Sequence, residues 1–161
     1  MLSGVSNQAV TFASATYKNY KVIMRWTQSA AASVTLRVRS GATDYTGAEY
    51  NQTSFFARSA GTSSGIFASA QNQTSAIMTG GTSGFDSGVT LINQIEMLVS
   101  NLFEATSTSF NFLVTTNDST GNTLSLFGAH RVRELTSRDG LNFLLASGTM
   151  TGTIQVFGVN E

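Results

Sequence analysis

Apolar and polar residues alternate with a period of two along most of the chain. The alternation is clearest over residues 20–27, 34–39 and 109–115, where every second residue is Val, Leu, Met, Phe, Tyr or Trp. Successive side chains of a β-strand point to opposite faces, so such runs indicate strands with one buried face. Val, Ile, Thr, Phe and Tyr, which fill these runs, also favour strands. The pattern predicts ten strands, near residues 9–13, 20–28, 33–39, 53–58, 74–79, 88–99, 108–116, 123–133, 141–146 and 152–159.

Clusters of small polar residues separate these runs, notably residues 40–44, 80–84 and 117–122. Gly, Asn and Asp tolerate the backbone angles of tight turns, so the clusters predict hairpins. Ten strands at this spacing predict a single-domain antiparallel β-sandwich, jelly-roll-like and with little or no helix, over residues 9–161. Residues 91–99 also fit helical spacing, but their neighbours favour a strand. Residues 59–73 are the expected long loop.

The N-terminal segment, residues 1–8, is polar and uncharged. We expect it to be an arm outside the sandwich. Two readings of this arm are open: a disordered end, or a segment ordered by a neighbouring molecule. It has neither the basic nor the apolar region of a signal peptide.

The composition excludes several classes of function. Only 11% of the 161 residues are charged, and nine Lys and Arg balance nine Asp and Glu. Nucleic-acid binders usually carry a basic surplus, so a nucleic-acid partner is not expected. No stretch reaches the roughly 18–20 apolar residues of a membrane helix, so no membrane partner is expected. A net charge of zero lets copies of the chain approach one another without repulsion, which favours association.

No pattern of residues points to catalysis or to a metal. Residues 61–65 (GTSSG) match the serine-nucleophile motif, but the motif needs a following helix and a partner histidine. The single histidine, His130, lacks the further ligands of a zinc site and is expected to be a locally hydrogen-bonded strand residue. We therefore expect no enzyme, no cofactor and no metal site. A glycosidase-like pair of carboxylates meeting in space remains a minor alternative.

One group of residues stands out as a candidate contact surface. Residues 40–58 are otherwise polar but contain Tyr45, Tyr50, Phe55 and Phe56, with Arg58 beside them. Aromatic residues and Arg are enriched at protein interfaces. The competing interpretation is that Phe55 or Phe56 covers the core.

Three stretches carry a resemblance to a known family. They are residues 12–26 (FASATYKNYKVIMRW), 36–45 (LRVRSGATDY) and 147–159 (SGTMTGTIQVFGV). Together they resemble the β-sandwich virion proteins of tailed bacteriophages, with a likeness that spans residues 9–159. The family tends to carry Phe-Asn-Gly where this chain has Val38, Arg39 and Ser40, which leaves the first hairpin open.

The resemblance implies a structural protein of the virion. Members of the family serve as capsid decoration (cement) proteins or as tail-fibre and tail-tip modules. Because the sequence has no shaft, stalk or second domain, we expect a cement protein, a homotrimer that binds the major capsid protein and stabilises the lattice. The alternative is a tail-fibre or tail-tip receptor-binding module that recognises a host-surface glycan. A glycan hydrolase or esterase is a distant third hypothesis.

Overall fold

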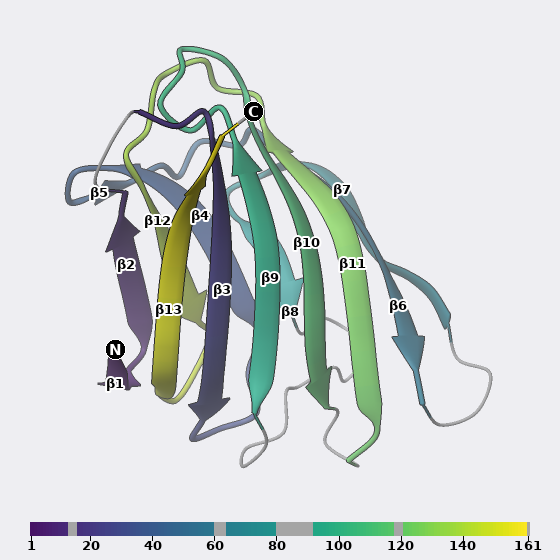
Figure 1. Cartoon of the computed structure of the whole chain (residues 1–161). Helices are drawn as coiled ribbons and strands as arrows, with labels where there is room; N and C mark the ends of the chain where they lie inside the picture. The colour runs from purple at the N-terminus through teal and green to yellow at the C-terminus, as the bar shows by residue number, and fades with distance from the viewer. Residues whose placement is uncertain (13–15, 60–63, 80–91, 118–120, 161) are drawn as a thin grey trace.

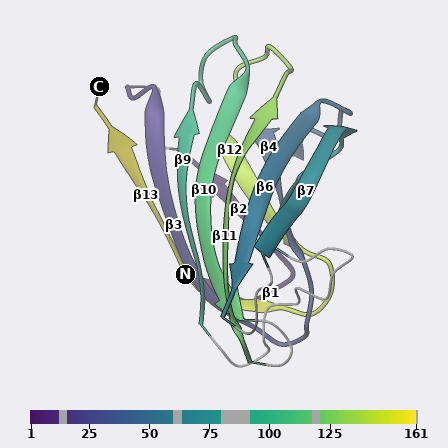
Figure 2. The same ribbon diagram turned by 90° about the vertical axis from the view of Figure 1, so that its right-hand side faces the viewer.

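The chain folds into two antiparallel sheets that lie face to face (Figures 1 and 2). A computed structural model describes residues 1–12, 16–59, 64–79, 92–117 and 121–160, with the backbone alone at residues 64, 66–68 and 79. Within these ranges every regular element is a strand. The all-β, jelly-roll-like sandwich expected from the sequence is confirmed.

The larger sheet has eight strands in the order β1-β13-β3-β9-β10-β11-β6-β7. The smaller sheet has the order β2-β12-β4-β5, with β8 also paired to β4, and lies behind the larger one in Figure 1. The strands are β1 (Leu2–Val5), β2 (Asn7–Thr11), β3 (Asn19–Gln28), β4 (Val34–Ser40), β5 (Thr43–Asp44), β6 (Tyr50–Arg58), β7 (Ser64–Gln73), β8 (Ala76–Thr79), β9 (Asn93–Ser100), β10 (Thr108–Asn117), β11 (Thr123–Val132), β12 (Gly140–Leu145) and β13 (Met150–Val159).

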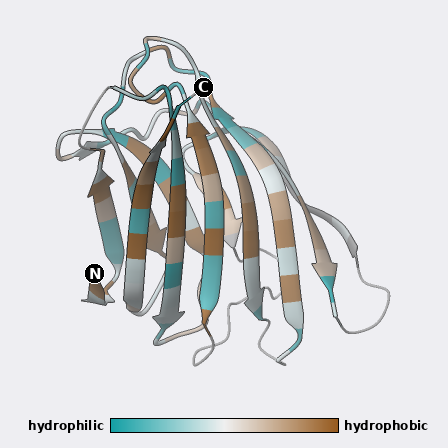
Figure 3. Ribbon diagram, in the orientation of Figure 1, coloured by the Kyte–Doolittle hydropathy of each residue, from teal (hydrophilic) through white to brown (hydrophobic). Residues whose placement is uncertain are grey.

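The core lies between the two sheets and consists of the apolar half of each alternating run. On β3 the buried residues include Val22, Met24 and Trp26, whereas the side chains between them are exposed or half-buried. Val22 is paired with Met97 and Met24 with Ile95 on β9, so the buried side chains form continuous rows. Figure 3 shows the alternation as bands of opposite hydropathy along the strands. The period of two therefore fixes which face of each strand is buried.

The N-terminal segment is part of the sandwich, which corrects the expected arm of residues 1–8. Leu2–Val5 pairs with β13, and Asn7–Thr11 pairs with β12. The side chain of Leu2 is buried in the core. The expected boundary between residues 8 and 9 falls inside β2. The sequence did not reveal this because the segment contributes few apolar side chains and is ordered by backbone pairing.

The long loop expected over residues 59–73 is also corrected, because Ser64–Gln73 is strand β7, paired with β6. This strand lies at the edge of the large sheet, where polar side chains are compatible with strand structure because solvent is close. The helical alternative for residues 91–99 is wrong, since Asn93–Ser100 is strand β9. The expected strand start at residues 88–91 lies outside the described residues.

Gly152 allows β13 to lie close to β3. A Cβ atom there would lie 2.0 Å from the carbonyl oxygen of Arg25 and 2.7 Å from the Cα of Trp26. We expect Gly152→Ala to lower the free energy of unfolding by about 2–3 kcal/mol, because backbone atoms cannot move aside cheaply. Chemical denaturation measures the change. Gly65→Ala is the control, since its Cβ would meet only a ring atom of Phe56 at 3.6 Å; equal losses in the two variants would contradict the expectation.

Candidate functional site

The outer face of the large sheet, turned away from the core, presents its side chains in straight rows. β10 pairs with β11 from Thr108 to Asn117 without a register shift, and β11 pairs as regularly with β6. The outward residues of β10 are Ser109, Asn111, Leu113 and Thr115, because the alternate residues are buried. The outward residues on β11 and β6 line up beside them, so the face is a grid of aligned side chains.

A hollow of about 520 Å³ lies on this face across β10, β11, β6 and β7. Its volume is within the range of small-ligand sites. Polar side chains with amide or hydroxyl groups dominate its outward lining, with a single charged group, the guanidinium of Arg131. The outward lining residues are Asn51, Thr53, Ser69, Gln71, Ser109, Asn111, Ala129 and Arg131. Among the described residues, no carboxylate lines the hollow.

Hydrogen bonds hold one end of the hollow in place. Arg131 donates from Nε to the Oγ of Ser107 at 2.8 Å. Arg133, two residues further, donates from Nη2 to the Oδ1 of Asn72, and the backbone N–H of Asn72 donates to the Oδ1 of Asn51 at 3.2 Å. Asn72 has a φ of 57°, a left-handed conformation that Asn adopts more readily than most residues. This conformation lets one residue bond to both Arg133 and Asn51.

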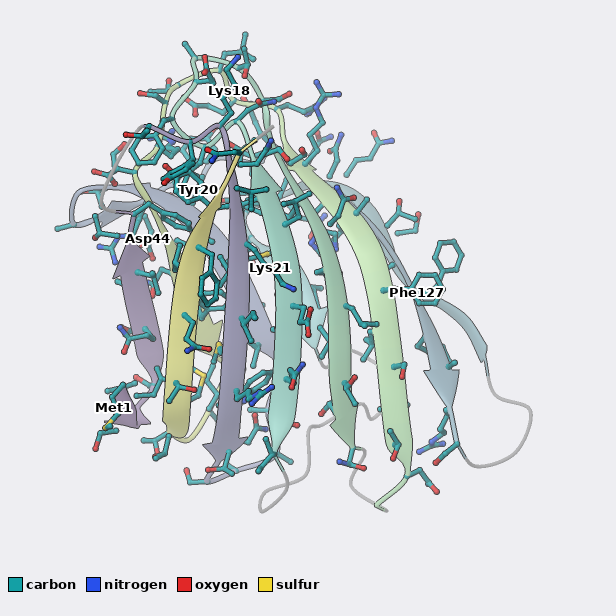
Figure 4. All side chains as sticks on the ribbon, in the orientation of Figure 1. Met1, Lys18, Tyr20, Lys21, Asp44 and Phe127 are labelled. Atoms are coloured by element: carbon teal, nitrogen blue, oxygen red, sulfur yellow. The ribbon has the colours of Figure 1, made fainter. Side chains whose placement is uncertain are left out.

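A row of exposed apolar side chains borders the hollow. Leu113, Phe127 and Phe55 face one another in register on β10, β11 and β6, and are 48%, 52% and 41% exposed. The rings of Phe55 and Phe127 are stacked with centroids 5.7 Å apart and 22° between their planes. Figure 4 shows Phe127 projecting away from the sheet. Leu113, Phe127 and Phe55 are called the apolar row below.

A second hollow of about 490 Å³ lies on the same face over β3, β9 and β10. Its lining is mainly apolar and includes the exposed Leu98, while Asn111 borders both hollows. Lys21, labelled in Figure 4, forms an ion pair with Glu96 at 3.1 Å beside it. The two hollows thus differ in their lining: polar side chains dominate the hollow over β10–β7, and apolar surface dominates the one over β3–β10.

The structure does not bring the five predicted contact residues together on one surface. Phe55 alone faces outward, within the apolar row. Phe56 is half-buried against the core, which fits the competing interpretation, and Arg58 is half-buried at the end of β6. Tyr45 is half-buried, with the guanidinium of Arg138 4.7 Å above its ring. The alternation along β6 separates Phe55 from its neighbours.

Tyr50 is fully buried, so it is a residue of the core and offers no surface to a partner. Its hydroxyl accepts a hydrogen bond from the backbone N–H of Val38 at 3.0 Å and donates one to the carbonyl oxygen of Tyr45 at 3.0 Å. Burial raises the pKa of the Tyr50 hydroxyl far above its usual value, so it remains a donor at all ordinary pH values. The hydroxyl joins the large sheet to the small one.

His130 is buried on the inner side of β11, with 2% of its surface exposed. Its ring meets that of Phe112 edge to face at 4.6 Å. Neither ring nitrogen has a hydrogen-bond partner among the described residues, so the expected local hydrogen bond is wrong. Burial lowers the pKa of His130 to about 4, because the charged form would lose its hydration. The imidazole is therefore neutral at neutral pH.

The remaining sequence candidates give no further site. Residues 61–63 of the serine motif lie outside the described residues. Within the described ranges, no three His, Asp or Glu side chains gather where they could hold a metal ion. The same ranges contain no helix long and apolar enough to cross a membrane.

The residues of the hollow were missed at the sequence level. Outward positions such as Asn111 and Arg131 could be recognised as exposed from the alternation alone. Their meeting with Asn51 and Thr53 depends on the pairing of β6 with β11, two strands that are far apart in the sequence. Only the pairing of β10 with β11 could be predicted from the sequence, because the turn residues between these two strands are recognisable.

Comparisons with known proteins give distant structural likenesses. No family model and no curated protein matches the sequence. A toad ovary galectin in complex with thio-digalactose is similar at a TM-score of 0.37, with 8% identity over 94% of this chain and 98% of the galectin. A tetrameric galectin from the ball sponge Cinachyrella sp. is similar at a TM-score of 0.36, with 11% identity over 96% and 99% of the two chains.

The burial of His130 predicts a pH dependence of stability. The folded pKa of about 4 lies below the unfolded value near 6.5, so the unfolded chain binds the extra proton in this interval. The stability contributed by neutral His130 is complete above about pH 6.5 and is lost as the pH falls toward 4, by about 3 kcal/mol at most. The chain has no other histidine.

Denaturation curves at several pH values measure this loss. We expect His130→Leu to remove most of the decline between about pH 6.5 and pH 4, because leucine carries no proton. The loss of stability that remains in the variant comes from protonation of carboxylates. The difference in stability between the two proteins therefore gives the contribution of His130. Parallel curves for the two proteins would contradict the assignment.

Proposed function

We propose that the chain is a carbohydrate-binding module, the receptor-binding part of a phage tail fibre or tail tip, which recognises a host-surface glycan. The observation that carries the proposal is the polar hollow on the outer face of the large sheet. The phage context rests on the resemblance of the three sequence stretches.

The chemistry of the hollow supports a ligand rich in hydroxyl groups. Asn, Gln, Ser and Thr side chains each both donate and accept hydrogen bonds, as sugar hydroxyls do. A site built to bond hydroxyl groups discriminates strongly against ligands that lack them. The stacked rings of Phe55 and Phe127, in the adjacent row, offer an apolar platform to the C–H face of a sugar. Weak single sites of this kind become strong when many copies bind one cell surface.

The experiment that tests the proposal substitutes Asn111, whose side chain borders both hollows. We expect Asn111→Ala to weaken glycan binding about tenfold, because lost hydrogen bonds to a bound ligand cost about 1–2 kcal/mol. Binding is measured on a glycan array and then by calorimetry with the glycans retained. The fold is checked by thermal unfolding.

Thr115→Ala is the matched control, since Thr115 is an exposed residue of the same strand and face that lines neither hollow. We expect it to leave glycan binding unchanged. If no glycan binds the wild-type chain, or if the two variants bind alike, the proposal fails.

A second candidate function, capsid decoration, is favoured by the apolar row. Exposed apolar side chains that adjoin one another often mark protein–protein contact sites. In this function the chain, as a homotrimer, binds the major capsid protein through that row and cements the lattice of the virion. Many repeated contacts would make a modest interface effective.

The polar hollow is required for glycan binding alone, so variants can separate the two functions. Capsid decoration predicts that Phe127→Ser weakens binding of the chain to phage heads at least tenfold, because truncating a central aromatic residue of an interface typically costs more than 1 kcal/mol. It predicts that Asn111→Ala has little effect there. The measurement is co-sedimentation with heads from phage that lack this chain. Labelling with antibody on tails only, together with no binding to heads, would contradict it.

A further inference from the structure

The polar hollow is flanked by two arginines without carboxylate partners. Arg131 lines the hollow near the end of β11, and Arg133 is the first residue after that strand. The ion pairs of the described residues are Lys21–Glu96, Arg39–Asp44 and Arg138–Glu134, and neither Arg131 nor Arg133 takes part in one. Among the described residues, therefore, neither guanidinium has a carboxylate within ion-pair distance.

Two arginines elsewhere in the chain are paired with carboxylates. Arg39 lies beside Asp44, with 3.7 Å between Nε and Oδ1, and Arg138 donates to Glu134 at 2.6 Å. Both pairs are intramolecular and need no ligand. The side chains of Arg39 and Arg138 are mostly buried, whereas Arg131 and Arg133 are exposed and have no carboxylate within ion-pair distance among the described residues.

The orientation of Arg131 leaves its terminal nitrogens to a ligand. Its Nε is occupied by the Oγ of Ser107, which holds the plane of the guanidinium. Nη1 and Nη2 have no hydrogen-bond partner among the described residues. A guanidinium binds a carboxylate best through two parallel N–H bonds, for which these two nitrogens are suited.

We infer that the glycan bound in the hollow carries a carboxylate, as uronic and sialic acids do, and that Arg131 binds this group through Nη1 and Nη2. The amides and hydroxyls of Asn51, Thr53 and Asn111 bind the sugar hydroxyls beside it. Arg133, held by Asn72, adds a second positive charge to the field of the site. This inference rests on the proposed function and specifies its ligand class.

Matched pairs of probes test it. The members of each pair differ only in whether their carboxyl groups are charged or esterified: trigalacturonate and its methyl ester, and sialyllactose and its methyl ester. Sulfated lactose serves as a non-planar anion. We expect the carboxylated member to bind about tenfold more tightly than its neutral partner, since hydrogen bonds to a charged group are roughly twice as strong as neutral ones. The preference should shrink between about 50 and about 500 mM salt, because the arginines are exposed.

Variants assign the preference to one side chain. We expect Arg131→Gln to bind both members of a pair equally, and Arg131→Lys to keep part of the preference because lysine retains the charge but not the planar fork. Arg25→Gln is the control. Arg25 is an exposed arginine on the same face whose Nε also donates to a side chain, that of Gln94, but it does not line the hollow.

The outcomes separate the inference from the function on which it rests. If acidic and neutral probes bind alike and Arg131→Gln changes neither, the inference is overturned while the glycan-binding function stands. If the sulfated probe binds more tightly than the carboxylated ones, the carboxylate assignment is overturned. If no probe binds, the proposed function fails, and the inference fails with it.

Discussion

The unbroken register of β9, β10, β11 and β6 is the constraint on which the rest of the structure depends. Because side chains alternate between faces, a slip of one residue would exchange every buried side chain for an exposed one. On β10 that slip would place Asn111 and Leu113 in the core and expose Phe110 and Phe112. The same register that closes the core therefore assembles the polar hollow and the apolar row on the opposite face.

Close packing in the interior beneath the hollow stabilises that register. A Cβ atom on Gly128 would lie 2.6 Å from the Cβ of Ser54 and 2.9 Å from a ring atom of Phe112. The missing side chain allows the ring of Phe112 to lie against His130, whose burial keeps it neutral. The side of β11 behind the hollow is thus buried and uncharged, and the positive charge of Arg131 belongs to the outer face alone.

The parts of this fold that could be predicted are those that depend on local sequence patterns. Alternation located most strands, and the turn residues located the hairpin of β10 and β11. Tyr50 illustrates the limit, because its spacing and aromatic character fit an exposed contact as well as a core residue. Its role depends on Val38 and Tyr45 supplying backbone partners across the two sheets. Contacts between distant strands have no local signature, so the hollow could not be predicted.

The low charge of the chain has a physical consequence that depends on where its few charged side chains lie in the structure. A Coulomb field at an exposed site is easily cancelled by a neighbouring carboxylate, and the screening length in physiological salt is only about 8 Å. Among the described residues, the lining of the hollow is built from amides and hydroxyls and places no carboxylate beside the guanidinium of Arg131. Because the other polar lining residues are neutral, Arg131 and the nearby Arg133 determine the electrostatics of the hollow.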